Sequence, residues 1–230
     1  MGSMDFDRLR DEVRMRCGRS TALDASTDWY GRWVNAGYLE LVTRNYHHAL
    51  HRKFVFPELE ASTTAATVDG TAYVSVPSDC LITRHLHNNT DDAPMRPLIG
   101  GYTKYVTMID KADTTAEAAP TIWCRAATRY YLYPTPDDAY TIGIYYRKRP
   151  TALSVGADVT ALGAEWDEAI CRLAAAQAFL TMHEYDKLKA SREDAIEYIG
   201  GLIGLYDQEG ANAKASMGVD TAYSGQNSYK

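Results

Sequence analysis

The sequence of 230 residues lacks any run of apolar residues long enough to cross a bilayer, which takes about 20 in succession. It also lacks a Cys-x-x-Cys pair, which argues against a zinc knuckle. We therefore expect no membrane association, and four reduced, buried thiols at Cys17, Cys80, Cys124 and Cys171. Positive charge is in deficit as well. The net charge of −6 argues against a protein whose whole surface grips nucleic acid.

Motifs that carry catalysis are missing too. The chain has no Gly-x-Ser-x-Gly elbow, Walker loop or dinucleotide-binding glycine fingerprint. His47 and His51 lie one turn apart on a predicted helix, but His48 stands where a His-Glu-x-x-His motif needs glutamate, and no third ligand is visible. His85 and His87 share a predicted strand face, and for them too a structural role is favoured over metal binding. We expect no catalytic residue, metal or cofactor, and a metal-dependent hydrolase using His47 and His51 stays as an alternative.

Two charged clusters have structural explanations. Glu165, Asp167 and Glu168 would face the positive end of the dipole at the start of a predicted helix. Residues 145–149, Tyr-Tyr-Arg-Lys-Arg, mix base-stacking and phosphate-binding types, but they fit a charged strand end at an interface as well as a short nucleic-acid patch. The 17 tyrosines are more informative, because tyrosine suits surfaces that become buried against partners. This excess favours assembly.

Two helices are predicted at the start of the chain. The first spans residues 5–17 and ends at Gly18. Its apolar stripe comprises Phe6, Leu9, Val13 and Cys17. The second runs from residue 28 to about residue 54, with Ser26 or Thr27 as its N-cap. Its stripe comprises Trp29, Trp33, Ala36, Leu39, Val42, Tyr46 and Leu50.

The composition changes between residues 67 and 150, where proline and glycine separate short runs rich in Thr, Tyr, Val and Ile. This pattern predicts strands, among them residues 71–76 and 80–86. Residues 102–109 fit a helix or a strand. Over residues 129–147, two aromatic, β-branched runs flank Pro-Thr-Pro-Asp-Asp, which predicts a hairpin.

Helical spacing returns after Pro150 and predicts helices over residues 164–182 and 185–206. The small, polar residues 207–230 bury too little apolar area to fold alone, so we expect a flexible arm. Its candidate partner contacts are Met217, Val219, Tyr223 and Tyr229.

The expected fold class is α+β, mainly an α-helical bundle with an inserted antiparallel β-rich lobe and an extended C-terminal arm. The boundaries we predict place N-terminal helices of the bundle in residues 1–60 and the inserted lobe in 61–155. They place the C-terminal helical pair in residues 156–206 and the arm in 207–230.

Six phrases carry a likeness to a known family. They are Trp33-Val-Asn-Ala-Gly-Tyr-Leu39, Tyr73-Val-Ser-Val-Pro-Ser-Asp79, Pro120-Thr-Ile-Trp123, Leu132-Tyr-Pro-Thr-Pro-Asp137, Tyr140-Thr-Ile-Gly-Ile-Tyr-Tyr-Arg-Lys-Arg-Pro150 with Leu153 after it, and Trp166-Asp-Glu-Ala-Ile170. In this order they resemble the head-to-tail adaptor (connector) proteins of tailed bacteriophages. The likeness extends to about Tyr206, and the most specific part is the strand–Pro-x-Pro-Asp–strand unit with the Arg-Pro and helical pair that follow it.

The resemblance implies a structural virion protein in the neck between capsid and tail, made in the host cytoplasm. Such proteins form a ring, commonly twelvefold, on the underside of the portal. They join the portal to the downstream tail protein and line a channel through which genomic DNA passes without specific binding. In that family the helices stack on neighbours and portal, the C-terminal arm docks on the portal, and no catalytic residue is invariant. Another phage tail component, such as a stopper, tail terminator or baseplate protein, is the alternative.

Overall fold

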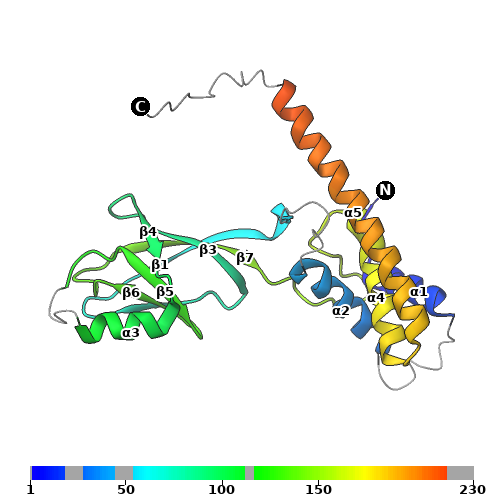
Figure 1. Ribbon diagram of the computed structural model, residues 1–230, viewed down its shortest axis with the longest axis horizontal. Helices are drawn as coiled ribbons and strands as arrows, with labels where there is room; N and C mark the ends of the chain where they lie inside the picture. The colour runs from blue at the N-terminus through cyan, green and yellow to red at the C-terminus, as the bar shows by residue number, and fades with distance from the viewer. Residues whose placement is uncertain (1, 19–27, 45–53, 112–116, 217–230) are drawn as a thin grey trace, which may run out of the picture. The chain divides into compact units, whose positions relative to one another are not determined.

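The computed structural model divides the chain into two compact units (Figure 1). It describes residues 2–18, 28–44, 54–111 and 117–216, with the backbone alone for residues 110, 111 and 207–216. The helical unit combines Met1–Val55 with Thr151–Lys230, and the β unit is Phe56–Pro150. Each unit has its own core, and each is described separately.

The first helix of the helical unit, α1 (Phe6–Cys17), confirms the sequence prediction. Asp5 caps it by accepting a hydrogen bond from the amide of Arg8 at 2.9 Å. All four residues of the predicted stripe are buried. Gly18 ends the helix with φ of 61°, the left-handed conformation that glycine adopts at little cost.

The second helix, α2 (Trp29–Thr43), differs from the prediction at both ends. Its N-cap is Asp28, which accepts from the amide of Gly31 at 2.8 Å, so the assignment to Ser26 or Thr27 is wrong. The predicted end at residue 54 is also wrong, because the backbone is already extended at Arg44. The last buried residue of α2 is Val42, and Thr43 and Arg44 after it are exposed. Residues 45–53, with His47, His51, Tyr46 and Leu50, lie outside the described residues.

The buried face of α2 is rotated from the predicted stripe. Trp33 and Val42 are buried as expected, whereas Leu39 is 40% exposed. The other buried residues of the helix are Tyr30, Gly31, Val34, Gly37, Tyr38 and Leu41. Apolar residues lie around most of this helix, so its periodicity alone left the inward face ambiguous.

Helix α4 (Asp167–Thr181) follows a 3-10 turn (Ala164–Trp166) and lies in contact with α1, α2 and α5. The predicted helix over residues 164–182 is therefore confirmed. Helix α5 extends from Tyr185 to Ser216, ten residues beyond the predicted end at Tyr206. Residues 207–216 contain several strong helix formers (Ala, Gln, Glu and Lys), which prolong the helix without an apolar stripe.

The β unit holds a mixed sheet of seven strands in the order β1-β7-β3-β4-β5-β6-β2. The strands are β1 (Glu60–Ala66), β2 (Tyr73–Ser75), β3 (Cys80–Asn88), β4 (Ala93–Pro97), β5 (Ile122–Ala126), β6 (Arg129–Tyr133) and β7 (Thr141–Lys148). The edge strands β1 and β2 approach each other, so the sheet is nearly closed. Every pair is antiparallel except β4 with β5, so the lobe expected to be antiparallel contains one parallel pair.

A single apolar core fills this sheet. Its buried members include Val74, Leu86, Met95, Trp123, Tyr130, Leu132, Ile142, Ile144 and Tyr146. The strands predicted at residues 71–76 and 80–86 are confirmed as β2 and β3, and residues 102–109 belong to a helix, α3 (Gly101–Lys111). Strand β1 escaped prediction, because only its alanines, Ala61 and Ala65, are half-buried and its other residues are small or polar.

The predicted hairpin over residues 129–147 is wrong in its pairing. Both strands form, but β6 pairs with β5 and β2, whereas β7 pairs with β1 and β3. The turn after β1 holds the link between them: the amide of Gly70 donates to the carbonyl of Pro136 and that of Thr67 to the carbonyl of Tyr140, each at 2.9 Å. With its backbone satisfied there, the link leads the two strands to different partners.

The fold is thus mixed α/β, with five α-helices and a seven-stranded sheet in the described part of the chain. A bundle architecture for the helices stays a prediction. None of the described helices combines the length and hydrophobicity that a bilayer span requires.

Candidate interaction surfaces

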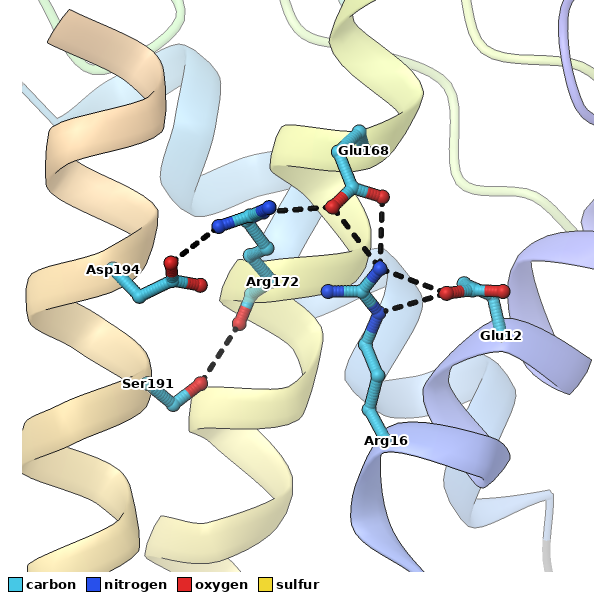
Figure 2. Close-up of polar contacts among 6 residues, drawn as sticks. All are labelled: Glu12, Arg16, Glu168, Arg172, Ser191 and Asp194. Atoms are coloured by element: carbon cyan, nitrogen blue, oxygen red, sulfur yellow. Dashed lines mark hydrogen bonds and ion pairs between the residues drawn. The ribbon is translucent and has the colours of Figure 1, made fainter.

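A ladder of alternating charges joins three helices of the helical unit (Figure 2). Arg16 of α1 lies 2.7 Å from Glu12 and 2.8 Å from Glu168 of α4. Arg172, one turn along α4, lies 2.7 Å from Glu168 and 2.5 Å from Asp194 of α5. The ladder fixes the relative position of α1, α4 and α5, because Glu168 is shared by both arginines.

The charges in the ladder compensate one another. Burial disfavours the charged form of Arg16, but its hydrogen bond to Glu12 and the charge of Glu168 outweigh burial and raise the pKa of Arg16. Burial likewise opposes the charge of Arg172, and Glu168 together with Asp194 raises the pKa of Arg172. Arginines held in this way are permanent cations, so the ladder is suited to holding helices together and not to proton transfer.

The three carboxylates at the start of α4 do not converge on one site. Glu168 belongs to the ladder, and Glu165 accepts a hydrogen bond from the hydroxyl of Tyr206. Asp167 is buried, and burial raises its pKa, although the amide of Met4 donates to it at 2.5 Å. Each acid therefore makes a separate contact within the helical unit.

An open groove of about 550 Å³ runs beside α5. It is lined by Arg172, Asp194, Glu197, Tyr198, Gly201, Leu202 and Leu205. Leu205 is 58% exposed there, and the guanidinium of Arg172 lies 4.6 Å from the centre of the Tyr198 ring. The groove thus combines apolar residues with two acidic groups and one cation, which suits a protein partner. This groove was not predicted from the sequence.

The β unit exposes an array of aromatic rings. Tyr102 of α3 and Tyr131 of β6 have ring centres 4.7 Å apart, and the ring of Tyr73 lies 6.2 Å from that of Tyr131. The guanidinium of Arg129 stands 4.0 Å over the Tyr73 ring. Beneath them Tyr105 is buried, which raises the pKa of its hydroxyl to about 12. Exposed tyrosine and arginine are the residue types that dominate binding at protein interfaces.

The basic run at the end of β7 is only partly open to solvent: Arg149 is exposed and Lys148 is half-buried. Arg147 is buried, with its guanidinium 3.5 Å from the carboxylate of Glu60. Burial and the nearby charge of Arg84 lower the pKa of Arg147. The neighbouring Tyr146 is buried too and donates to Asp79 at 2.9 Å. These contacts make Tyr146 and Arg147 part of the β unit's own structure.

The candidate metal ligands are only partly described. His47 and His51 lie outside the described residues. His85 stacks on Tyr145 with ring centres 4.2 Å apart, and His87 lies 3.1 Å from the side-chain oxygen of Asn89. Within the residues that the structure describes, His, Cys, Asp and Glu form no group of three or more able to hold a metal.

A family model described as SU10 adaptor protein matches residues 4–222, a span that covers both units. The chain belongs to the SU10 adaptor protein family. This result confirms the resemblance to phage adaptors, and the family is one of phage structural adaptors, which are generally non-enzymatic. No curated protein matches the sequence.

The family match also bears on the arm. It continues beyond Tyr206, the limit of the likeness noted in the sequence, and includes Met217 and Val219 but not Tyr223 or Tyr229. All four of these candidate partner contacts lie outside the described residues. The family match therefore includes residues 207–222, which the resemblance seen in the sequence did not cover.

Proposed function

We propose that this protein is the head-to-tail adaptor of a tailed phage, located in the virion neck. Copies form a ring on the underside of the portal, commonly twelvefold in such adaptors, join it to the downstream tail protein and surround the passing DNA. The observation that carries the proposal is the SU10 adaptor match across both units. The net charge of −6 supports passage of DNA without tight binding, because such a surface does not neutralise phosphates.

Each unit has surface chemistry that fits a different neighbour. In the helical unit, the ladder through Arg16 and Glu168 holds three helices as one body, which suits a part that stacks against the portal and against other copies. In the β unit, the array around Tyr102 and Tyr131 suits the downstream tail protein. The division into N-terminal helices, inserted lobe and C-terminal helical pair at residues 60 and 155 is part of the same proposal, whereas the arm, expected from residue 207, can begin only after α5 ends at Ser216.

The proposal assigns portal docking to the end of the chain. Residues 217–230 follow the last described turn of α5 and are rich in small and polar types. A segment of this composition orders when it binds, and it can cover a large surface for its length. Met217, Val219, Tyr223 and Tyr229 are the side chains we expect to contact the portal.

Co-assembly with the cognate portal tests this function. The full chain is expected to co-sediment with portal particles, and a variant lacking residues 217–230 is expected to stay folded and remain free. A matched variant in which Tyr223 and Tyr229 are serine keeps the length of the arm and should bind at least about tenfold more weakly. Full-chain protein that ignores the portal would contradict the proposal. Stoichiometric metal in purified protein, lost when His47 and His51 are replaced, would favour the hydrolase instead.

A further inference from the structure

Helix α2 carries a stripe that its own unit does not cover. At 100° per residue, Arg32, Ala36, Leu39 and Thr43 lie on one face, opposite the buried face of the helix. Leu39 is 40% exposed, and Arg32 is exposed with its guanidinium 5.4 Å from the centre of the Trp29 ring. Arg32 has no carboxylate partner in the described part of the chain. The stripe therefore presents one cation and two apolar side chains to the outside.

The groove beside α5 offers a matching surface. Glu197 at its rim is exposed, and no ion pair to it is found among the described residues. Three glycines lie close together, at positions 200, 201 and 204, and a Cβ added to any of them would meet nothing within 4 Å. Glycine inside a helix costs about 1 kcal/mol relative to alanine. Among the described residues no packing compensates for that cost, and Gly201, which lines the groove, leaves room there for a side chain from outside.

The two surfaces agree in charge, size and spacing. Arg32, Ala36 and Leu39 succeed one another along α2 over seven residues, about 10 Å of helix. Glu197, Gly201 and Leu205 succeed one another along α5 over eight residues, about 12 Å of helix. When the two helices dock in parallel, Arg32 faces Glu197. Ala36 then faces Gly201, and Leu39 faces Leu205.

We infer that α2 of one copy of this chain docks in the α5 groove of the next copy. The two surfaces are different, so the contact is head-to-tail, and repetition of a head-to-tail contact closes a ring when its rotation allows. The inference rests on the proposed function, since it names the surfaces by which neighbours in the adaptor ring meet. It is independent of the arm and of the β unit.

Paired cysteines test the contact directly. The native thiols of Cys17, Cys80, Cys124 and Cys171 are all buried, so background cross-linking is low. The double variant Leu39→Cys/Leu205→Cys, treated with a short bis-maleimide, is expected to give a ladder of covalent multimers. Each single variant should give monomers only. The cross-linking is carried out on concentrated free protein and on the mixture with portal.

Three results would overturn the inference: no covalent multimers of the double variant in either sample, dimers from Leu39→Cys alone, or cross-links from Leu205→Cys to the portal. The second would mean a two-fold contact, and the third would mean that the portal occupies the groove. Association of the wild-type chain with the portal is scored separately. Its failure would count against the proposed function, whereas a missing ladder with normal portal binding would count against the inference alone.

A charge swap gives a second readout. Arg32→Glu or Glu197→Arg is expected to reduce multimer formation by about tenfold, and the two together should restore it. Lys189→Glu is the matched control. It also reverses one charge, at an exposed residue of α5 outside the groove, and should have no effect. Equal loss in the double variant would contradict the pairing.

Discussion

Arg16 of α1 donates to Glu168 of α4 at 2.8 Å, although 152 residues separate them in the sequence. In the sequence the whole β unit lies between these two residues, so the contact joins the N-terminal and C-terminal parts of the helical unit. Glu168 also accepts from Arg172, so one carboxylate balances two cations. The stability of the helical unit therefore depends on this residue more than on any surface ion pair.

Replacing Glu168 with glutamine is expected to destabilise the helical unit by about 1–3 kcal/mol. The change leaves Arg16 and Arg172 close together without the negative charge that both use. Asp11→Asn, which removes an exposed i,i+3 pair with Arg14, is the control and should cost less than about 0.5 kcal/mol. Urea unfolding compares the two variants, and equal losses would contradict the role given to the ladder.

Glu40 is expected to make the helical unit sensitive to acid. Burial opposes its charge, but hydrogen bonds from Arg192, Arg44 and Gln177 hold the pKa of Glu40 below its ordinary value of 4.5. Unfolding therefore takes up a proton at low pH. The stabilisation is present above pH 4.5 and is lost as the pH falls through the lower folded value.

The variant Glu40→Gln tests this dependence. At pH 7 it is expected to be less stable than wild type by about 1.5–3 kcal/mol, because charged hydrogen bonds are lost. As the pH falls below 4.5 the difference between the two proteins should shrink. Unfolding curves of both proteins at pH 7 and below pH 4.5 give the result. A stability difference that stays constant between these pH values would mean that Glu40 does not titrate in this range.

Two glycine-to-alanine changes are expected to have opposite signs. A Cβ at Gly37 would lie 2.7 Å from the backbone nitrogen of Ala174, so Gly37→Ala forces α2 and α4 apart and should cost about 1–3 kcal/mol. At Gly200 nothing lies within 4 Å, and Gly200→Ala should stabilise α5 by about 0.5–1 kcal/mol. Thermal unfolding distinguishes them. A neutral Gly37→Ala would show that the two helices are not packed this closely.

The aromatic array of the β unit is expected to bind the downstream tail protein. Tyr102→Ala should weaken that association by about tenfold while the unit stays folded, since Tyr102 is 43% exposed. Tyr145→Ala, at a tyrosine of similar exposure that stacks on His85, is the control. Binding of the purified tail protein is the measurement. Equal weakening by both changes would argue against a localised contact.

Local patterns in the sequence predicted local structure well. The stripe from Phe6 to Cys17, with Gly18 after it, was sufficient for α1, because capping and periodicity agree there. The face of α2 was predicted less well, since apolar residues such as Leu39 and Tyr38 occur on both sides of it. The length of α5 was underestimated because residues 207–216 have helix propensity but no apolar stripe in the sequence.

Relations between distant segments were beyond the sequence. The aromatic runs on either side of Pro136 predicted two strands, but nothing local showed that β6 and β7 pair with other partners. The groove was missed for the same reason. Its lining joins Arg172 of α4 to Leu205 of α5, and only packing brings these residues together.

The location of the protein in the virion tests the central claim most directly. Electron cryo-microscopy of the phage neck should reveal a ring of this chain between portal and tail, with α2 of each copy beside α5 of its neighbour. Density for the chain at the distal end of the tail, or its absence from the particle, would contradict the account.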